Sequence, residues 1–323
     1  LAAAFSSDGA RVYTVRGIPQ MAPSARLLRQ RMRINRRGTT FFSTTTNRLA
    51  AYELASEGKL IWEIDGGRPR GRLPGAFFLG APLAVDGNLF ALAEIKSAIY
   101  LVALDPPSGE VRWRQQLVSL ERSIALDAAV DVSNRTLVWE HLYQRAEKVV
   151  RCHGLFLGQH GQLHMRNRED RWLDSSPLVQ GDRVIVAPPD ATQMFCLDAR
   201  TGEVQWQQPR GEHLFVGCTT EDAVLAVGAK IVTAYALDDG SPKWQPTQVA
   251  LPSATLTCGR GVLSDGQYFV PLADGSIAGI DVSSGRISTD TPGSVPQVLG
   301  NLICHGGALL SQWPVSVHKF EQR

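Results

Sequence analysis

The densest group of possible metal ligands lies between residues 152 and 164. It consists of Cys152, His153, His160 and His164. Thiolate and imidazole groups are the ligands that Zn²⁺ prefers. Their spacing matches no established zinc motif, so we interpret this stretch as a loop and leave metal binding as the alternative.

A run of arginines between residues 24 and 38 is the strongest local bias in charge. Such a run could attract phosphate groups or an anionic lipid surface. Four of the arginines could share one face of a short helix, but the interleaved apolar residues favour a packed loop or strand. Aromatic residues for base stacking are absent, which argues against nucleic acid. We expect a solvated excursion before the first full repeat, with contact to a polyanion or a partner as the alternative. The arginines are Arg26, Arg29, Arg31, Arg33, Arg36 and Arg37.

No other pattern indicates catalysis. The chain has no G-x-S-x-G elbow, phosphate-binding loop or dinucleotide fingerprint. Its 33 basic and 31 acidic residues give a net charge of +2, which predicts no polyanionic partner for the chain as a whole. The five cysteines form no C-x-x-C pair, and we expect them to be mostly buried free thiols. No run of about 18 apolar residues could span a membrane as a helix.

One phrase recurs along the chain: a short apolar strand, an aspartate, a tight turn with glycine, and a tryptophan. Copies occupy residues 49–62, 100–113, 195–206, 235–244 and 277–289, and a weaker copy occupies 129–139. The aspartate precedes the tryptophan by eight positions at 105/113, 131/139 and 198/206. Self-similarity of this kind is typical of repeat architectures.

Each copy follows a second pair of apolar stretches joined by an Asp-Gly or Gly-Asp turn. Examples are residues 85–91, 179–186 and 263–270. Such turns are the strongest short-range signal of a β-hairpin, so each unit reads as four short strands. Units of this kind are the blades of a β-propeller. We therefore expect an all-β chain that forms a single propeller domain over residues 1–323, with about seven four-stranded blades, or eight as the alternative.

The ends and the middle of the chain are less regular. Residues 300–304, 308–311 and 315–320 read as three strands of a last blade. Residues 11–15 could complete that blade or open the first one. The uneven spacing between Trp113 and Trp206 predicts an inter-blade insertion over residues 140–174. The chain begins with Leu1, and we interpret it as a processed or partial form of a longer protein.

Residues 196–206 resemble the PQQ-like (quinoprotein-type) propeller repeat, A-x-D-x-x-T-G-x-x-x-W, with Cys196 in place of alanine. The resemblance extends over most of residues 47–320. It is similar in particular to the BamB-like group of outer-membrane assembly lipoproteins and to large repeat proteins of planctomycete-type bacteria.

The resemblance implies that the tryptophan of each blade docks against the next blade and that the glycine lies in a turn. Glycine takes a positive φ without strain, aspartate caps such a turn, and tryptophan offers a large apolar ring with one N–H donor. The residues that we expect in this docking role are Trp62, Trp113, Trp139, Trp206, Trp244, Gly58, Gly109, Gly202, Gly285, Asp105, Asp198 and Asp281.

These observations favour a non-catalytic scaffold that binds protein or peptide through its faces and loops. The resemblance implies a location in the cell envelope, and we expect a monomeric ring without a cofactor or a bound metal. The alternative is a quinoprotein-like enzyme or sensor that binds pyrroloquinoline quinone or another small molecule in a central funnel. The vicinal cysteine pair that often accompanies such enzymes is missing.

Overall fold

The computed structural model shows that the chain is an all-β protein of the β-propeller class. The structure describes residues 5–16, 47–96, 98–119, 176–188, 191–252, 256–288, 298–313 and 316–320, together with the backbone of four short strands outside these ranges. The chain divides into two compact units, Ala2–Pro177 and Leu178–Arg323. No apolar helix long enough to cross a bilayer occurs among the described residues.

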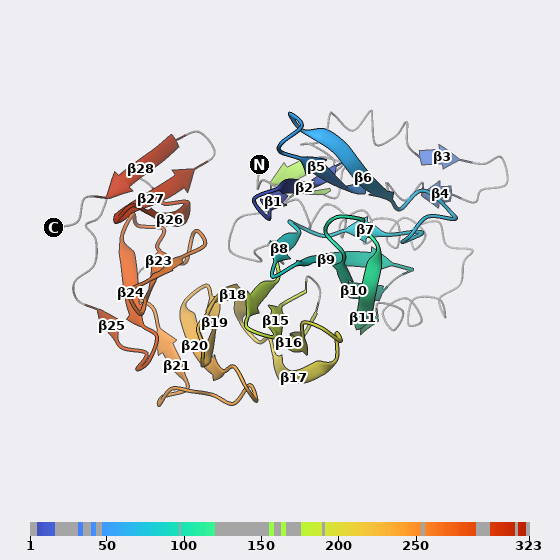
Figure 1. The fold of residues 1–323 in the computed structure, drawn as a ribbon. Coiled ribbons are helices and arrows are strands. Elements are labelled where there is room, and N and C mark those ends of the chain that lie inside the picture. The colour runs from blue at the N-terminus through green and yellow to red at the C-terminus, as the bar shows by residue number, and fades with distance from the viewer. Residues whose placement is uncertain are drawn as a thin grey trace. The chain divides into compact units, whose positions relative to one another are not determined.

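The first unit contains two larger sheets and two strand pairs (Figure 1). One sheet has the order β1-β2-β5-β6, and the other has the order β11-β10-β9-β7, with β8 also paired to β9. The strands are β1 (Phe5–Ser7), β2 (Arg11–Arg16), β3 (Met32–Ile34), β4 (Thr40–Phe42), β5 (Arg48–Glu53), β6 (Lys59–Asp65), β7 (Phe77–Phe78), β8 (Leu83–Val85), β9 (Asn88–Ile95), β10 (Ala98–Leu104), β11 (Val111–Ser119), β12 (Leu155–Leu157) and β13 (Leu163–Met165).

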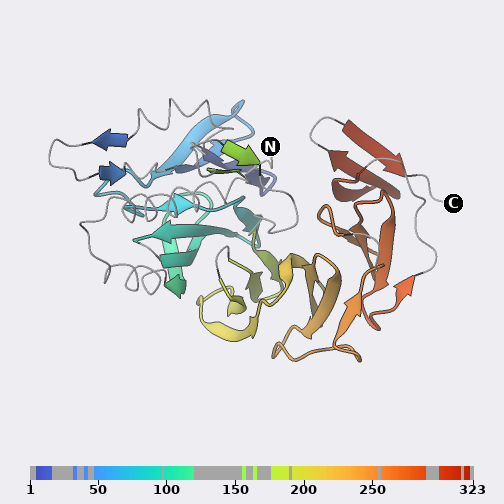
Figure 2. The same cartoon turned by 180° about the vertical axis from the view of Figure 1, so that it is seen from behind.

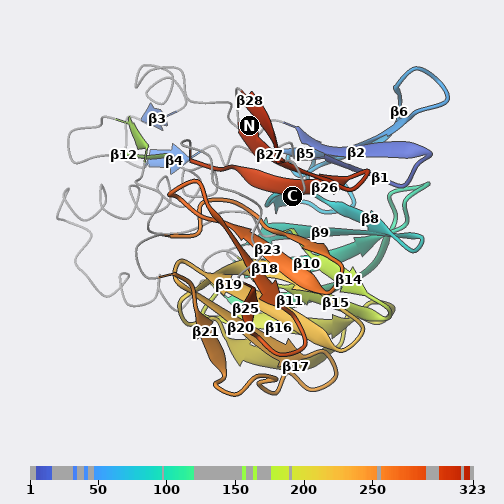
Figure 3. The same cartoon turned by 90° about the vertical axis from the view of Figure 1, so that its left-hand side faces the viewer.

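The second unit contains three four-stranded sheets that follow one another in chain order (Figures 1 and 2), and a three-stranded sheet β26-β27-β28 (Figure 3). The strands are β14 (Leu178–Gln180), β15 (Arg183–Val186), β16 (Gln193–Asp198), β17 (Val204–Pro209), β18 (His213–Thr219), β19 (Ala223–Gly228), β20 (Ile231–Ala236), β21 (Gln248–Ala250), β22 (Val262–Ser264), β23 (Gln267–Pro271), β24 (Ile277–Asp281), β25 (Ile287–Ser288), β26 (Asn301–His305), β27 (Ala308–Trp313) and β28 (Ser316–Phe320). The three strands expected near the C-terminal end are thereby confirmed.

The hairpins between the first and second strands have the expected sharp turns. Asp86 and Gly87 have φ angles of 47° and 67° between β8 and β9, and Asp265 and Gly266 have 49° and 74° between β22 and β23. Two consecutive residues with positive φ define a type I′ turn, whose twist matches that of the flanking strands. The Asp-Gly pairs therefore fix the register of these hairpins.

The middle strands of each sheet carry the hydrophobic core. β19 is buried at all of its positions, and β10 at nearly all. The outer strand β11 instead alternates between half-buried and exposed residues. An uninterrupted apolar strand has both of its faces covered, whereas an alternating strand has one face in water. Sheets stacked face to face, as in propeller blades, give this pattern.

The first strands of neighbouring sheets also lie side by side. β1 contacts β8 in the first unit, and β18 contacts both β14 and β22 in the second. Of these first strands, β8, β14 and β22 are short and half-buried, whereas β18 is seven residues long and mostly buried. Successive sheets within each unit therefore meet both along their faces and along their first strands.

The structure corrects the expected position of the arginine-rich excursion. β2 pairs with β5, so both strands belong to the first sheet, and the residues between Arg16 and Asn47 connect them. The excursion therefore interrupts the first sheet instead of preceding it. Residues 11–15 lie in β2, the second strand of this first sheet.

Asn47 joins this sheet to the next one through a buried side chain. Its Nδ2 donates to the Phe78 carbonyl at 2.7 Å, and its Oδ1 accepts from the Phe78 N–H at 2.7 Å. Asn47 is 0% exposed. A buried amide that satisfies both backbone groups of one residue acts like a strand partner, so it holds the end of β7 in place.

A histidine and an arginine join the second unit's first two sheets. The Arg210 guanidinium donates to the carbonyls of Pro188 (2.9 Å), His213 (2.9 Å) and Leu214. The His213 Nδ1 lies 2.8 Å from the Arg210 carbonyl, and its Nε2 lies 2.9 Å from the Thr233 hydroxyl. Because the Arg210 carbonyl can only accept, Nδ1 carries a proton, and in the neutral imidazole Nε2 accepts from the Thr233 hydroxyl. Burial lowers the pKa of His213, and the nearby Arg210 charge acts in the same direction.

We predict that the protein loses stability as the pH falls below about 6.5, the ordinary pKa of histidine, because the lowered pKa of His213 means that the unfolded chain binds this proton more readily than the folded protein. His213→Gln should be less stable at neutral pH, but its unfolding free energy should fall less as the pH is lowered. Urea unfolding of both proteins at pH 7 and pH 5 measures the difference. An equal pH dependence for the two proteins would contradict the assignment.

Candidate functional site

Three of the repeat turns share one backbone geometry. The N–H of Gly109 donates to the Asp105 carbonyl at 2.7 Å, and the N–H of Asp105 donates to the Glu110 carbonyl at 2.8 Å. The same two bonds, at 2.8 and 2.9 Å, join Gly202 to Asp198 and Gly285 to Asp281 and close those turns. All three glycines have a φ angle between 70° and 78°, a region that favours glycine.

The aspartate side chains cap these turns. The Asp198 Oδ1 accepts from the N–H groups of Thr201 (2.7 Å) and Arg200 (2.9 Å). These bonds lower the pKa of Asp198, with the Thr201 N–H as the largest cause. The hydroxyls of Ser283 and Ser284 lower the pKa of Asp281 in the same way. For Asp105 the Ser108 hydroxyl is the largest cause, followed by Arg112.

Three tryptophans contact the turn of the following sheet through their indole N–H groups. Trp62 donates to the Pro106 carbonyl at 2.8 Å, Trp206 to the Leu237 carbonyl at 2.7 Å, and Trp244 to the Val282 carbonyl at 2.9 Å. The three side chains are between 2% and 7% exposed. Each tryptophan therefore ties the outer part of its own sheet to the next sheet in the chain.

A glycine lies against each of these rings. A Cβ atom added to Gly109, Gly240 or Gly285 would lie 2.7 Å from Cδ2 of Trp62, Trp206 or Trp244, respectively. Real Cβ atoms do not approach other atoms this closely. Glycine is therefore required at these positions for two reasons: the turn has a positive φ, and the indole ring leaves no room for a Cβ atom.

Sequence reasoning missed Gly240 as a docking residue. In this shortened repeat, Ala236 takes the backbone role of the aspartate, because the Gly240 N–H donates to the Ala236 carbonyl at 2.9 Å. The signal was present, since Gly240 precedes Trp244 by four positions as in the other copies. The expected aspartate, Asp238, is not the residue that this bond engages.

Three further predicted residues are described to different extents. The Trp113 ring is half-buried, with its centroid 5.8 Å from that of Phe90. Trp139 lies outside the described residues. Gly58 has a φ of 81°, and no atom lies within 4 Å of the position of an added Cβ.

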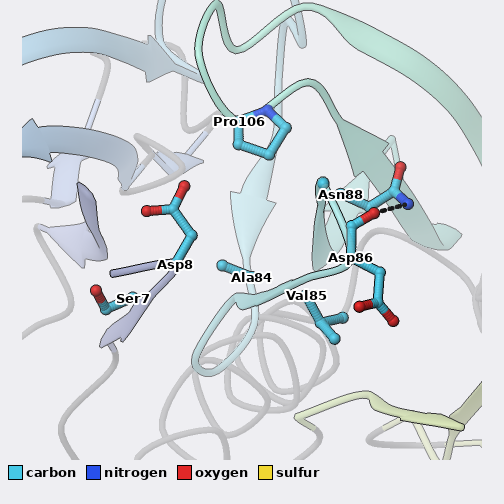
Figure 4. A pocket seen from close by; sticks show the side chains of 8 residues that line it. Ser7, Asp8, Ala84, Val85, Asp86, Asn88 and Pro106 are labelled. Atoms are coloured by element: carbon cyan, nitrogen blue, oxygen red, sulfur yellow. Dashed lines mark hydrogen bonds between the residues drawn. The ribbon is translucent and has the colours of Figure 1, made fainter. Parts of the chain in front are cut away.

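A half-open hollow of about 310 Å³ lies in the first unit beside the Trp62 contact (Figure 4). The end of β1 contributes Ser7 and the turn after it contributes Asp8, and Pro106 belongs to the turn that binds Trp62. The β8–β9 hairpin contributes Ala84, Val85, Asp86, Gly87 and Asn88. The lining thus combines two carboxylates with a short apolar wall and includes no basic side chain among the described residues.

The two carboxylates of the hollow differ in their surroundings. Asp8 accepts four hydrogen bonds, from the N–H groups of Ala10 and Arg11, the Arg11 guanidinium and the Tyr13 hydroxyl. Burial acts to raise the pKa of Asp8, but these bonds together lower it, with Tyr13 contributing most among them. The carboxylate of Asp86 makes no hydrogen bond or ion pair with the described residues. Asp8 is therefore a fixed charge, whereas Asp86 is free to meet a ligand.

The rim of the hollow is held by an arginine. Arg112 donates from Nη1 to the Asn88 Oδ1 and from Nη2 to the Asp105 Oδ1, both at 2.6 Å. The β8–β9 hairpin is thereby tied to the turn that receives Trp62. The docking contact and the hollow share one rigid framework.

The candidate metal ligands and the arginine run lie largely outside the described residues. Of residues 152, 153, 160 and 164, only His164 is included, as part of the backbone of β13. Of the arginine run, only Arg33 is included, as part of the backbone of β3. The other five lie outside the described residues, namely Arg26, Arg29, Arg31, Arg36 and Arg37. The insertion over 140–174 is described only at β12 and β13. Elsewhere in the described chain, no three His, Cys, Asp or Glu residues are arranged to hold a metal ion.

The described cysteines are free thiols. Cys196, Cys218 and Cys258 are buried as expected, whereas Cys304 is exposed. Burial raises the pKa of the Cys196 and Cys218 thiols to about 12. A thiol that stays protonated at neutral pH is a poor nucleophile and metal ligand, so these two cysteines act as core residues.

The sequence matches the family model of outer membrane protein assembly factor BamB over residues 34–153 and 128–298. Among solved structures, the computationally designed Ika8 protein is similar with a TM-score of 0.53 and 12% identity, over 98% of this chain and 70% of that one. BamB from Moraxella catarrhalis is similar with a TM-score of 0.49 and 17% identity, over 85% of this chain. The match spans 64% of that BamB chain. No curated protein sequence matches.

We predict that Gly109→Ala destabilises the protein by about 1–3 kcal/mol more than Gly87→Ala, because only the first methyl group would overlap the Trp62 ring. Gly87 is a matched control: its φ of 67° is close to the 70° of Gly109, and nothing lies within 4 Å of its added Cβ. Urea unfolding followed by tryptophan fluorescence measures both variants. Equal losses of stability would show that the ring contact does not constrain Gly109.

Proposed function

Since the chain belongs to the family of outer membrane protein assembly factor BamB, we propose that it is a non-catalytic scaffold of the cell envelope that binds segments of other proteins. The family match covers residues 34–298, which include most of the described sheets. The ligands of this scaffold would be polypeptide segments, bound at the turns and hairpins of its sheets.

This proposal rests on the observation that the repeat residues hold the fold together. The carboxylates of Asp105, Asp198 and Asp281 are occupied by hydrogen bonds within their own turns. A carboxylate held in this way, with a lowered pKa, is a poor general base at neutral pH. The groups that remain free for binding lie on the hairpins, as Asp86 does.

The hollow beside Trp62 suits a basic side chain on an extended segment. Its apolar wall of Ala84, Val85 and Pro106 could cover the aliphatic stem of a lysine or arginine. The free carboxylate of Asp86 and the fixed charge of Asp8 would meet the cationic head. Because Asp86 is solvent-exposed, this ion pair contributes specificity more than affinity.

We predict that Asp86→Asn weakens the binding of a short extended peptide with one central lysine by about threefold, the effect of one exposed ion pair. The peptide should shift the backbone amide signals of Gly87 and Asn88 in NMR spectra. Asp265→Asn is the matched control, because Asp265 occupies the same position of a type I′ turn in the β22–β23 hairpin.

The same protein should be incubated with pyrroloquinoline quinone and Ca²⁺ and passed over a gel-filtration column. The scaffold role predicts no retained quinone absorbance and no dye reduction with simple alcohols. If the protein retained the quinone and reduced the dye with alcohols, and the peptide caused no NMR shifts, the quinoprotein alternative would replace the scaffold role.

A further inference from the structure

The hollow beside the Trp62 contact has walls from two neighbouring sheets of the first unit. Ser7 and Asp8 belong to the sheet β1-β2-β5-β6, whereas the β8–β9 hairpin and Pro106 belong to the next sheet (Figure 4). The strands β1 and β8 also contact each other. A ligand in the hollow would therefore touch both sheets, and the shape of the site depends on how the two sheets are joined.

The Trp62 indole fixes the wall that the second of these sheets contributes. Its N–H donates to the Pro106 carbonyl at 2.8 Å, and Pro106 itself lines the hollow. The guanidinium of Arg112 donates to both Asn88 on the rim and Asp105 in the turn. The turn at Pro106 and the β8–β9 hairpin are thus positioned together by two side chains that do not line the hollow.

The same indole also contacts the side chain that holds the other wall. The rings of Trp62 and Tyr13 have centroids 6.0 Å apart, and the Tyr13 hydroxyl donates to the Asp8 Oδ2 at 2.7 Å. Tyr13 is 0% exposed and Trp62 is 7% exposed, and both belong to one core cluster. Closely packed rings cannot move independently. Trp62 therefore connects the contacts that hold Asp8 with those that hold the β8–β9 hairpin.

We propose that Trp62 is a positioning residue of the hollow, so that docking of the first two sheets and binding of a basic side chain stabilise each other. The inference rests on the proposed scaffold role and names the contact on which that binding site depends. The bound cation would lie between Asp8 on one sheet and Asp86 on the other, which adds a contact across the joint that Trp62 closes. Such coupling acts equally in both directions.

The other two docking tryptophans are internal references for this role. Trp206 and Trp244 make the same bond, to the carbonyls of Leu237 and Val282 in the second unit. All of the residues that line the hollow belong to the first unit. A purely structural role would be shared by the three tryptophans, whereas coupling to the hollow is expected of Trp62 alone.

The test uses the whole chain and the short extended peptide with one central lysine, at about three times its Kd. Indole N–H exchange of the three tryptophans is followed by ¹H–¹⁵N NMR with and without the peptide. Because binding requires the docked joint, exchange of Trp62 should slow by about fourfold, the factor 1 + [L]/Kd for a ligand that binds only the closed form. Exchange of Trp206 and Trp244 should not change.

Trp62→Phe keeps an aromatic ring beside Tyr13 and Gly109 but removes the indole N–H donor. It should weaken binding of the lysine peptide by about fivefold. Trp244→Phe is the matched control, because it removes the same kind of bond from a joint in the second unit. It should bind the peptide like the unaltered chain. The exchange measurement needs no variant, so it stays decisive if Trp62→Phe destabilises the fold.

Peptide-induced shifts at Gly87 and Asn88 without slower exchange of Trp62 would overturn the positioning role and leave the scaffold role standing. Equal slowing of all three tryptophans would also overturn it, since general stabilisation of the fold would then explain the effect. Equal affinities of the Trp62→Phe and Trp244→Phe variants would do the same. Absence of shifts at Gly87 and Asn88 would remove binding at the hollow and this inference with it.

Discussion

The structure depends on the contact between an indole ring and the turn of the following sheet. Its three described instances combine an N–H donor, a backbone carbonyl and a glycine that leaves room for the ring. The contact explains the repeat, because the turn needs glycine for its φ and its packing, and aspartate to cap it. A buried carbonyl without its donor would cost about 1–3 kcal/mol, so tryptophan is favoured over other aromatic residues at this place.

These contacts constrain the turns between the third and fourth strands of three sheets, whereas the hairpins between the first and second strands receive no tryptophan in the described contacts. The middle strands are buried on both faces, and the repeat residues are occupied in holding sheets together. Binding groups are therefore expected where a turn carries something that the framework does not use, such as the carboxylate of Asp86 on the β8–β9 hairpin.

Much of the fold could be predicted from sequence because its signals are local. The Asp-Gly pairs at 86–87 and 265–266 predicted β-hairpins, and the structure confirms both hairpins. The contacts of Asn47, Arg210 and His213 could not be predicted, since each joins side chains to backbone groups that are brought together only by folding. The arginine excursion was placed before the first sheet because no local signal shows that β2 pairs with β5 across it. The hollow arises from three separate turns, and no single stretch of sequence encodes it.

Hydrogen exchange of the indole N–H groups of Trp62, Trp206 and Trp244, followed by ¹H–¹⁵N NMR, tests the central claim most directly. If these groups hold the sheets together, their exchange requires separation of the sheets. It should then be slower than that of a free indole by about a thousandfold or more, as expected for core elements. Exchange within about tenfold of the free indole would show that the sheets do not depend on these contacts.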